Sequence, residues 1–122
     1  MDNYIGLNHV QVSGPKGKDK IAIEFYEGVL GFKQIAKPES LKARGGAWFE
    51  IGNNQQLHYG VEDEFTAAKK AHPAFEVKSL ETLKNILKNK NYDYKIDDLL
   101  PHADRIFVND PFGNRLEFME LK

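Results

Sequence analysis

The sequence LNHVQVSGPKGKDKIAIEFYEGVLGF, residues 7–32, decides how the first part of the chain folds. Polar and apolar residues alternate from Tyr4 to Val12, which predicts a strand with His9 on one face. The residues at 13–15, Ser-Gly-Pro, predict a break. Apolar residues then recur at helical spacing from Asp19 to Leu30, and the glycine at 31 is a typical helix stop. This stretch therefore predicts a strand followed by an amphipathic helix with one buried side.

The remaining sequence completes this unit and then repeats its order. Three more strands are expected over 32–36, 46–51 and 56–61, and Gly52-Asn53-Asn54 predicts a tight hairpin between the last two. After a polar connector at 62–70 the order recurs, with a strand at 72–77, a helix capped by Ser79, and strands at 92–96, 105–108 and 115–121. Each half is thus predicted to be a βαβββ module.

Length and repetition together predict one α+β domain over residues 1–122. A module of about 60 residues buries only about 60% of its unfolded surface and is marginal alone. We therefore expect module one (about 1–61), the connector (62–70) and module two (about 71–122) to fold together. A repeat of this length that occurs twice indicates a duplicated module and not a solenoid array.

Composition excludes several classes of function. Seventeen basic and eighteen acidic residues give a net charge of −1 without a basic block, so no nucleic-acid partner is expected. The start of the sequence carries an acidic residue where a secretory signal is basic, and no apolar stretch approaches the roughly 20 residues of a membrane span. We expect a cytoplasmic protein. The absence of cysteine excludes disulfides and a thiol nucleophile.

Four side chains of metal-binding types lie at matching places in the two halves. His9 and His72 are separated by 63 residues, and His58 and Glu117 by 59. In both final strands the neighbouring residues form an apolar face, so period-two geometry places His58 and Glu117 on the face turned away from the helix. Imidazole and carboxylate donors suit a borderline divalent metal. The pattern predicts a site built from all four.

Other interpretations of the histidines remain open. A single strand histidine is more often a satisfied or surface residue than a metal ligand. His58 could line a pocket instead of binding the ion. His102 lies in a loop beside a proline, where we expect a substrate contact or a solvated side chain and not a ligand.

Several of these segments together resemble the vicinal oxygen chelate superfamily, which includes glyoxalase I, fosfomycin-resistance thiol transferases, extradiol dioxygenases, methylmalonyl-CoA epimerases and bleomycin-resistance proteins. The resemblance covers essentially the whole chain and rests on LNHVQV, FYEGVLGF, QLHY, HPAFEV and NDPFGNRLEF. It implies two βαβββ modules that form a cupped mixed sheet around a divalent metal. It also implies a homodimer in which modules of different subunits build each cup.

The resemblance implies roles for individual residues. His9, His72 and Glu117 match the family's His, His and Glu ligands, whereas His58 stands where glyoxalase I has a glutamate. That departure argues against glyoxalase I activity, and the remaining ligand set resembles manganese transferases and ferrous dioxygenases. The ion expected is Zn, Ni, Mn, Fe or Co. Three side chains would flank the cup: Arg44, Trp48 and Arg105. They could bind an anionic or aromatic substrate. Alternatively, they contribute only surface charge and core packing.

These observations favour a metal-dependent enzyme that acts on a small oxygen-chelating substrate. Its reaction would be of the lyase, thiol transferase or dioxygenase type. The alternative is a binding protein that sequesters a drug or metabolite without catalysis, but relatives of that kind generally lack the ligand residues. A metal-binding fold without catalysis is the third possibility.

Overall fold

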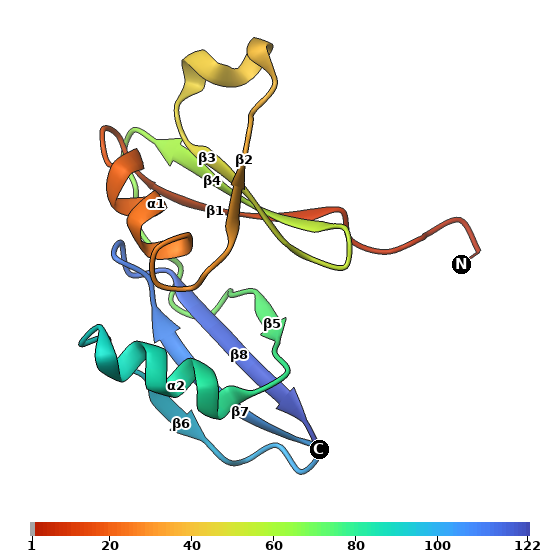
Figure 1. The fold of residues 1–122 in the computed structure, drawn as a ribbon. Coiled ribbons are helices and arrows are strands. Elements are labelled where there is room, and N and C mark those ends of the chain that lie inside the picture. The colour runs from red at the N-terminus through yellow and green to blue at the C-terminus, as the bar shows by residue number, and fades with distance from the viewer. Residues whose placement is uncertain (1) are drawn as a thin grey trace. The chain divides into compact units, whose positions relative to one another are not determined.

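The computed structural model describes residues 2–122 and contains two compact units, one ending at Phe65 and the other beginning at Thr66 (Figure 1). Each unit holds one four-stranded mixed sheet and one α-helix. The α+β class and the repeated order of elements are therefore confirmed. That the two units fold together as one domain stays a prediction.

The first unit has the strand order β1-β4-β3-β2. The edge strand β1 runs parallel to β4, and the other neighbours are antiparallel. Its elements are β1 (His9–Pro15), α1 (Asp19–Tyr26), β2 (Lys33–Ile35), the 3-10 helix η1 (Glu39–Arg44), β3 (Ala47–Gly52) and β4 (Gln55–Glu62).

The second unit repeats this topology with the strand order β5-β8-β7-β6. Here β5 is parallel to β8, and the remaining pairs are antiparallel. Its elements are β5 (Ala74–Glu76), α2 (Leu80–Asn89), β6 (Lys95–Asp97), β7 (Ala103–Asn109) and β8 (Arg115–Leu121). Across residues 2–122 we find no helix with the length and apolar character that a membrane span needs.

One face of each sheet packs against the helix of its own unit. In the first unit, Tyr26 of α1 lies on Phe49 of β3 with ring centroids 5.7 Å apart, and both side chains are buried. In the second, Leu83 and Leu87 of α2 are buried, as is Leu116 of β8. Because successive side chains of a strand alternate between faces, the intervening residues point away from the helix. That opposite face carries the candidate site.

Equivalent strands pair in the same register within each of the two sheets. His58 of β4 lies opposite Trp48 of β3, and Glu117 of β8 lies opposite Phe107 of β7. Each donor is thus flanked by an aromatic residue at the same place in its sheet. The duplication extends to individual cross-strand pairs.

Two local signals are confirmed at residue level. Asn53 and Asn54 both have positive φ, 52° and 58°, as a two-residue type I′ hairpin requires. Ser79 caps α2, because its Oγ accepts a hydrogen bond from the Thr82 backbone N–H at 3.1 Å.

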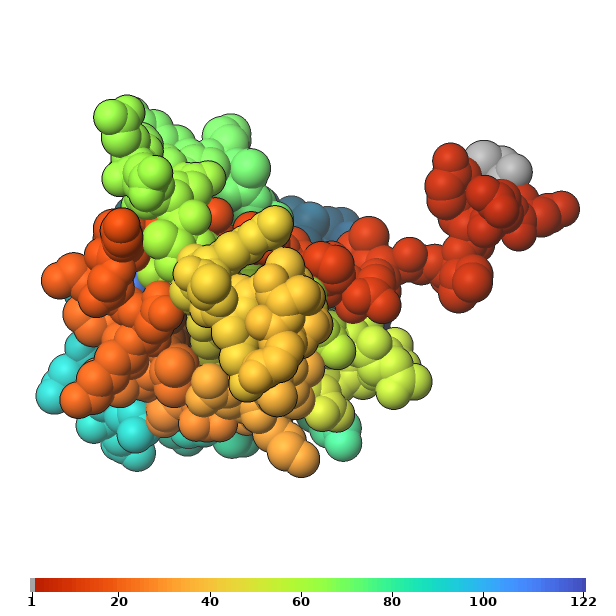
Figure 2. All heavy atoms as spheres, turned by 90° about the horizontal axis from the view of Figure 1, so that it is seen from above, coloured from red at the N-terminus to blue at the C-terminus, as the bar shows by residue number. Residues whose placement is uncertain are grey.

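The first strand begins later than expected and runs through the predicted break. β1 starts at His9, where its parallel partner β4 begins, and the preceding residues leave the sheet (Figure 1) and stand out from the surface as an arm (Figure 2). Pro15 is accommodated because β1 is an edge strand. A side-chain carbon at Gly14 would lie only 2.4 Å from the Tyr59 hydroxyl, so this glycine makes room for a ring and does not form a turn.

The first helix is shorter than expected. α1 ends at Tyr26, because the backbone N–H groups of residues 28 and 30 reach carbonyls five residues back and widen the helical turn. Gly31, with φ 81°, then turns the chain toward β2. Gly31 therefore marks the end of the whole helical segment, as predicted, whereas the regular α-helix ends earlier, at Tyr26.

Candidate functional site

His9 and His58 lie together on the open face of the first sheet. Their rings stack with centroids 4.0 Å apart, and Trp48 stacks on the other face of His58 at 3.8 Å. His58 is only 4% exposed, and its Nε2 lies 2.8 Å from the side-chain oxygen of Gln56. The first unit therefore brings its two predicted donors into contact.

The environment of His58 keeps its imidazole neutral. Burial is the main cause that lowers its pKa from 6.5 to about 4, and the positive charges of His9 and Lys37 lower it further. A neutral imidazole is the form that binds metal ions.

The second unit brings His72 and Glu117 together. His72 precedes β5, and its Nε2 lies 2.8 Å from Oε1 of Glu117 on β8. The other ring nitrogen, Nδ1, lies 2.7 Å from the backbone carbonyl of Lys70. Because a carbonyl only accepts hydrogen bonds, Nδ1 carries a hydrogen, and Nε2 is directed at the carboxylate. This is the arrangement in which a backbone carbonyl orients a metal-binding histidine.

Glu117 is a buried carboxylate with two partners. It is 5% exposed, and while Oε1 faces His72, Oε2 lies 3.3 Å from Nη1 of Arg105. Arg105 also lies 3.3 Å from Asp97, between Nε and Oδ1. The charge of Glu117 is therefore balanced within the second unit. Arg105, a candidate for substrate contact, therefore forms ion pairs with two carboxylates of its own unit.

The donor chemistry of both pairs fits a divalent metal. Two ligands bound at about 2.1 Å to one ion lie roughly 3.0 to 3.4 Å apart for ordinary bond angles. His72 Nε2 and Glu117 Oε1 lie 2.8 Å apart, at hydrogen-bond distance and just below this range. Among residues 2–122, neither unit alone gathers three or more such donors. Convergence of the two pairs on one ion stays a prediction.

The other candidate contacts occupy different places. Trp48 is half-buried against His58 and so belongs to the first donor pair. Arg44 is exposed at the end of η1. His102 is exposed in the turn before β7, where its backbone carbonyl accepts a hydrogen bond from Lys122.

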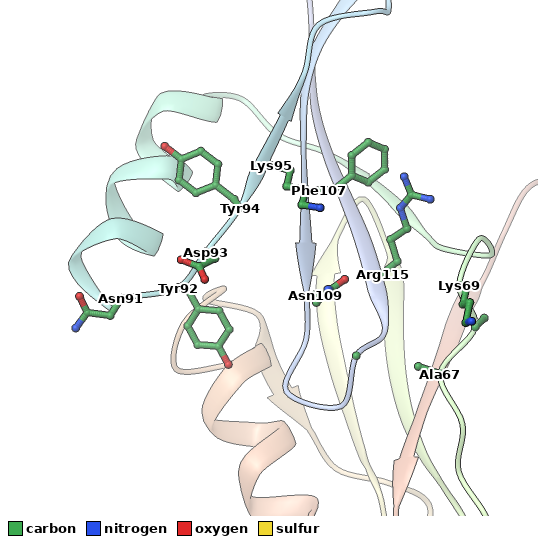
Figure 3. Close-up of a pocket in the computed structure, with 12 residues that line it drawn as sticks. Ala67, Lys69, Asn91, Tyr92, Asp93, Tyr94, Lys95, Phe107, Asn109 and Arg115 are labelled. Carbon is green, nitrogen blue, oxygen red and sulfur yellow. The ribbon is translucent and has the colours of Figure 1, made fainter.

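An open cavity of about 810 Å³ is lined by residues of the second unit (Figure 3). Its lining includes aromatic and basic side chains that the sequence patterns did not indicate as site residues: Lys69, Tyr92, Tyr94, Lys95, Phe107 and Arg115. Phe107 joins the cavity to the donor pair, because its ring lies 5.5 Å from that of His72. Period-two alternation of the last strand could have indicated Arg115, because it precedes Glu117 by two residues and so lies on the same face of the sheet.

Two βαβββ units with the same strand order define a class of duplicated α+β proteins, and sequence comparison identifies the family. The model of the Glyoxalase/Bleomycin resistance protein/Dioxygenase superfamily matches residues 6–118. The chain belongs to this superfamily.

Individual relatives agree with this assignment. The chain is 31% identical over 120 residues to Glyoxylase I 4 of Arabidopsis thaliana, covering 91% of this chain and 68% of that protein. It is 47% identical to a glyoxalase family protein from Bacillus anthracis, with a TM-score of 0.95 and full coverage of both chains. The fosfomycin resistance protein FosX of Listeria monocytogenes, solved with Mn(II) and 1S,2S-dihydroxypropylphosphonic acid, shares the fold at 16% identity, with a TM-score of 0.76 and coverage of 96% and 92%.

Proposed function

We propose that the protein is a divalent-metal-dependent enzyme acting on a small oxygen-chelating substrate, by a lyase, thiol transferase or dioxygenase type of reaction. The observation that carries this proposal is the pairing of donors at equivalent places in two sheets, His9 with His58 and His72 with Glu117. The manganese ion in the Listeria protein of the same fold supports it. Zn, Ni, Mn, Fe and Co all suit such a donor set.

The chain's own residues would prepare the site for chemistry. A bound divalent ion would supply Lewis acidity that stabilises negative charge developing on a substrate oxygen. Glu117 provides the single negative charge among the four donors, and Arg105 holds its second oxygen. The carbonyl of Lys70 orients His72, and Trp48 fixes the ring plane of His58. These contacts preorganise the ligands before substrate arrives.

We further infer a homodimer in which each site uses donors from both subunits. Each unit supplies only two of the four donors, so a site needs one unit of each kind. The segment before β1 also exposes three large apolar side chains, Tyr4, Ile5 and Leu7, which are 78%, 104% and 77% exposed. A second subunit could cover these side chains. A two-fold arrangement would make both sites equivalent.

Metal titration of the chelator-treated protein by calorimetry tests the proposed site. We expect one ion per chain, and we expect Glu117→Ala to weaken binding more than His58→Ala. A water can replace a neutral ligand, whereas loss of the carboxylate also removes charge neutralisation. His102→Ala is the matched control, because this histidine lies outside both pairs. Equal effects of all three substitutions, or no metal binding by the unaltered protein, would contradict the proposal.

The second candidate function is binding of a drug or metabolite without catalysis. The cavity of about 810 Å³ in the second unit favours it, because this volume is typical of small-molecule pockets. The two functions differ in turnover. A metal-loaded protein that binds a co-purified ligand and never converts it would favour sequestration.

A further inference from the structure

The cavity of the second unit carries an excess of positive charge. Three cationic side chains line it, Lys69, Lys95 and Arg115, against one carboxylate, Asp93 (Figure 3). Within the part of the chain that the structure describes, none of the three cations has a carboxylate partner within 4.0 Å. A concave surface lined mostly by one sign of charge concentrates ions of the opposite sign.

Arg115 has the geometry of a prepared anion receptor. Its guanidinium carbon lies 4.1 Å from the centroid of the Phe107 ring, and the residue is half-buried. The aromatic face limits rotation of the guanidinium plane and leaves the N–H groups at its edge available. Arg105 lies 5.0 Å from the same ring but is held by Asp97 and Glu117. Arg105 is thus paired with two carboxylates, whereas Arg115 forms no ion pair within the described residues.

The duplication shows that the sheet itself does not require an arginine here. Arg115 precedes Glu117 by two residues, and the equivalent residue in the first unit, two before His58, is Gln56. Gln56 is neutral, and its side-chain oxygen lies 2.8 Å from the His58 ring. The two modules therefore use this position differently.

We propose that this cavity is an anion-binding subsite, in which Arg115 receives a carboxylate or a phosphate-type group of the substrate. This inference rests on the proposed function in that it names the substrate class of the same site. Planar two-oxygen groups match the fork of a guanidinium. The Phe107 ring beside Arg115 adds aromatic surface, which suits a ligand with a ring or an apolar body. Lys69 and Lys95 add two further positive charges to the lining.

Binding of small aromatic probes to the metal-free full chain tests this subsite. The probes are phenylphosphonate, benzoate and the uncharged analogue phenol, followed by ¹⁵N NMR shifts and calorimetry in low salt with EDTA. We expect both anions to shift the resonances of residues 107 and 115, and phenol to bind at least tenfold more weakly. The anion that binds more tightly identifies the preferred headgroup. Raising the salt concentration should weaken anion binding, because the attraction is screened.

Substitutions distinguish specific anion binding at Arg115 from attraction by the overall charge of the protein. Arg115→Gln should weaken anion binding at least tenfold, and Arg115→Lys by less, because it keeps the charge and loses the fork. Lys78→Gln is the matched control, since it removes the same charge from an exposed position outside the cavity. Retained dispersion in the ¹⁵N spectrum would show that each variant is folded.

Several results would overturn the subsite. Equal weakening by Arg115→Gln and Lys78→Gln would show that anions bind through the overall charge of the protein. Equal binding of phenol would show that the probes bind through apolar contact alone. Shifts confined to other residues would place the anion elsewhere. Because the probes are tested without metal, failure here leaves the metal titration of the four donors unaffected. Conversely, anion binding by a protein that never binds metal would contradict the proposed function and leave the subsite intact.

Discussion

Lowering the pH should destabilise the metal-free protein through one buried side chain, His58. Its pKa is lowered in the folded protein from 6.5 to about 4, chiefly by burial. The unfolded chain therefore binds more protons than the folded one between these two values, and stability falls as the pH drops through this window. Above about pH 6.5 the contribution of His58 is complete.

The size of the effect follows from the two pKa values. A folded pKa of about 4 against 6.5 unfolded gives a loss of about 2 kcal/mol from pH 7 to pH 5, and of about 3 kcal/mol by pH 4. Stacking on Trp48 favours the imidazolium by about 1 kcal/mol. We therefore expect His58 to account for a loss of about 1 to 2 kcal/mol at pH 5.

Urea unfolding in EDTA at pH 7, 6 and 5 measures this effect. The chain has one tryptophan, Trp48, which stacks on His58, so its fluorescence reports the unfolding of the first unit. The free energy of unfolding of His58→Gln should fall less between pH 7 and 5 than that of the unaltered protein. His102→Gln, at an exposed position, is the control and should follow the unaltered protein. The same pH dependence in His58→Gln as in the control would refute the reasoning.

Three further experiments test the core, the backbone and the subunit arrangement. Leu87→Ala, at a fully buried position, should lower the free energy of unfolding by about 2 to 5 kcal/mol in a denaturant titration. Gly46→Ala should cost more stability than Gly17→Ala in the same assay. Both have positive φ, but only at Gly46 would the added carbon meet a backbone oxygen, at 2.2 Å. Mixing His9→Ala with Glu117→Ala subunits should restore about a quarter of the metal sites after random exchange, since only heterodimers regain one intact site. No restoration despite exchange would show that the site lies within one chain.

Local rules were sufficient for much of the fold. The hairpin at Asn53 and Asn54 and the cap at Ser79 depend on neighbouring residues alone, and both are observed as expected. The last strand, β8, has the predicted bounds because its alternation is uninterrupted between a turn and the end of the pattern. Period-two geometry also placed His58 and Glu117 on the faces turned away from the helices.

Features that depend on how distant strands pair could not be predicted from the sequence. The start of β1 is set by where β4 begins, and the glycine at 14 is needed for a ring 45 residues later in the chain. The ion pairs of Arg105 require β6 and β8 to flank β7, which no local pattern specifies. The stacking of His58 between His9 and Trp48 likewise follows from the order of three strands.

A crystal structure of the protein soaked with Mn(II), with anomalous diffraction to locate the ion, tests the central claim most directly. We predict one strong anomalous peak per chain, bonded at about 2.0 to 2.2 Å by nitrogens of His9 and His72 and an oxygen of Glu117, with His58 as the fourth donor or next to it. A peak away from these side chains, or fully occupied Mn(II) held by only one of the two pairs, would contradict a site built from both modules.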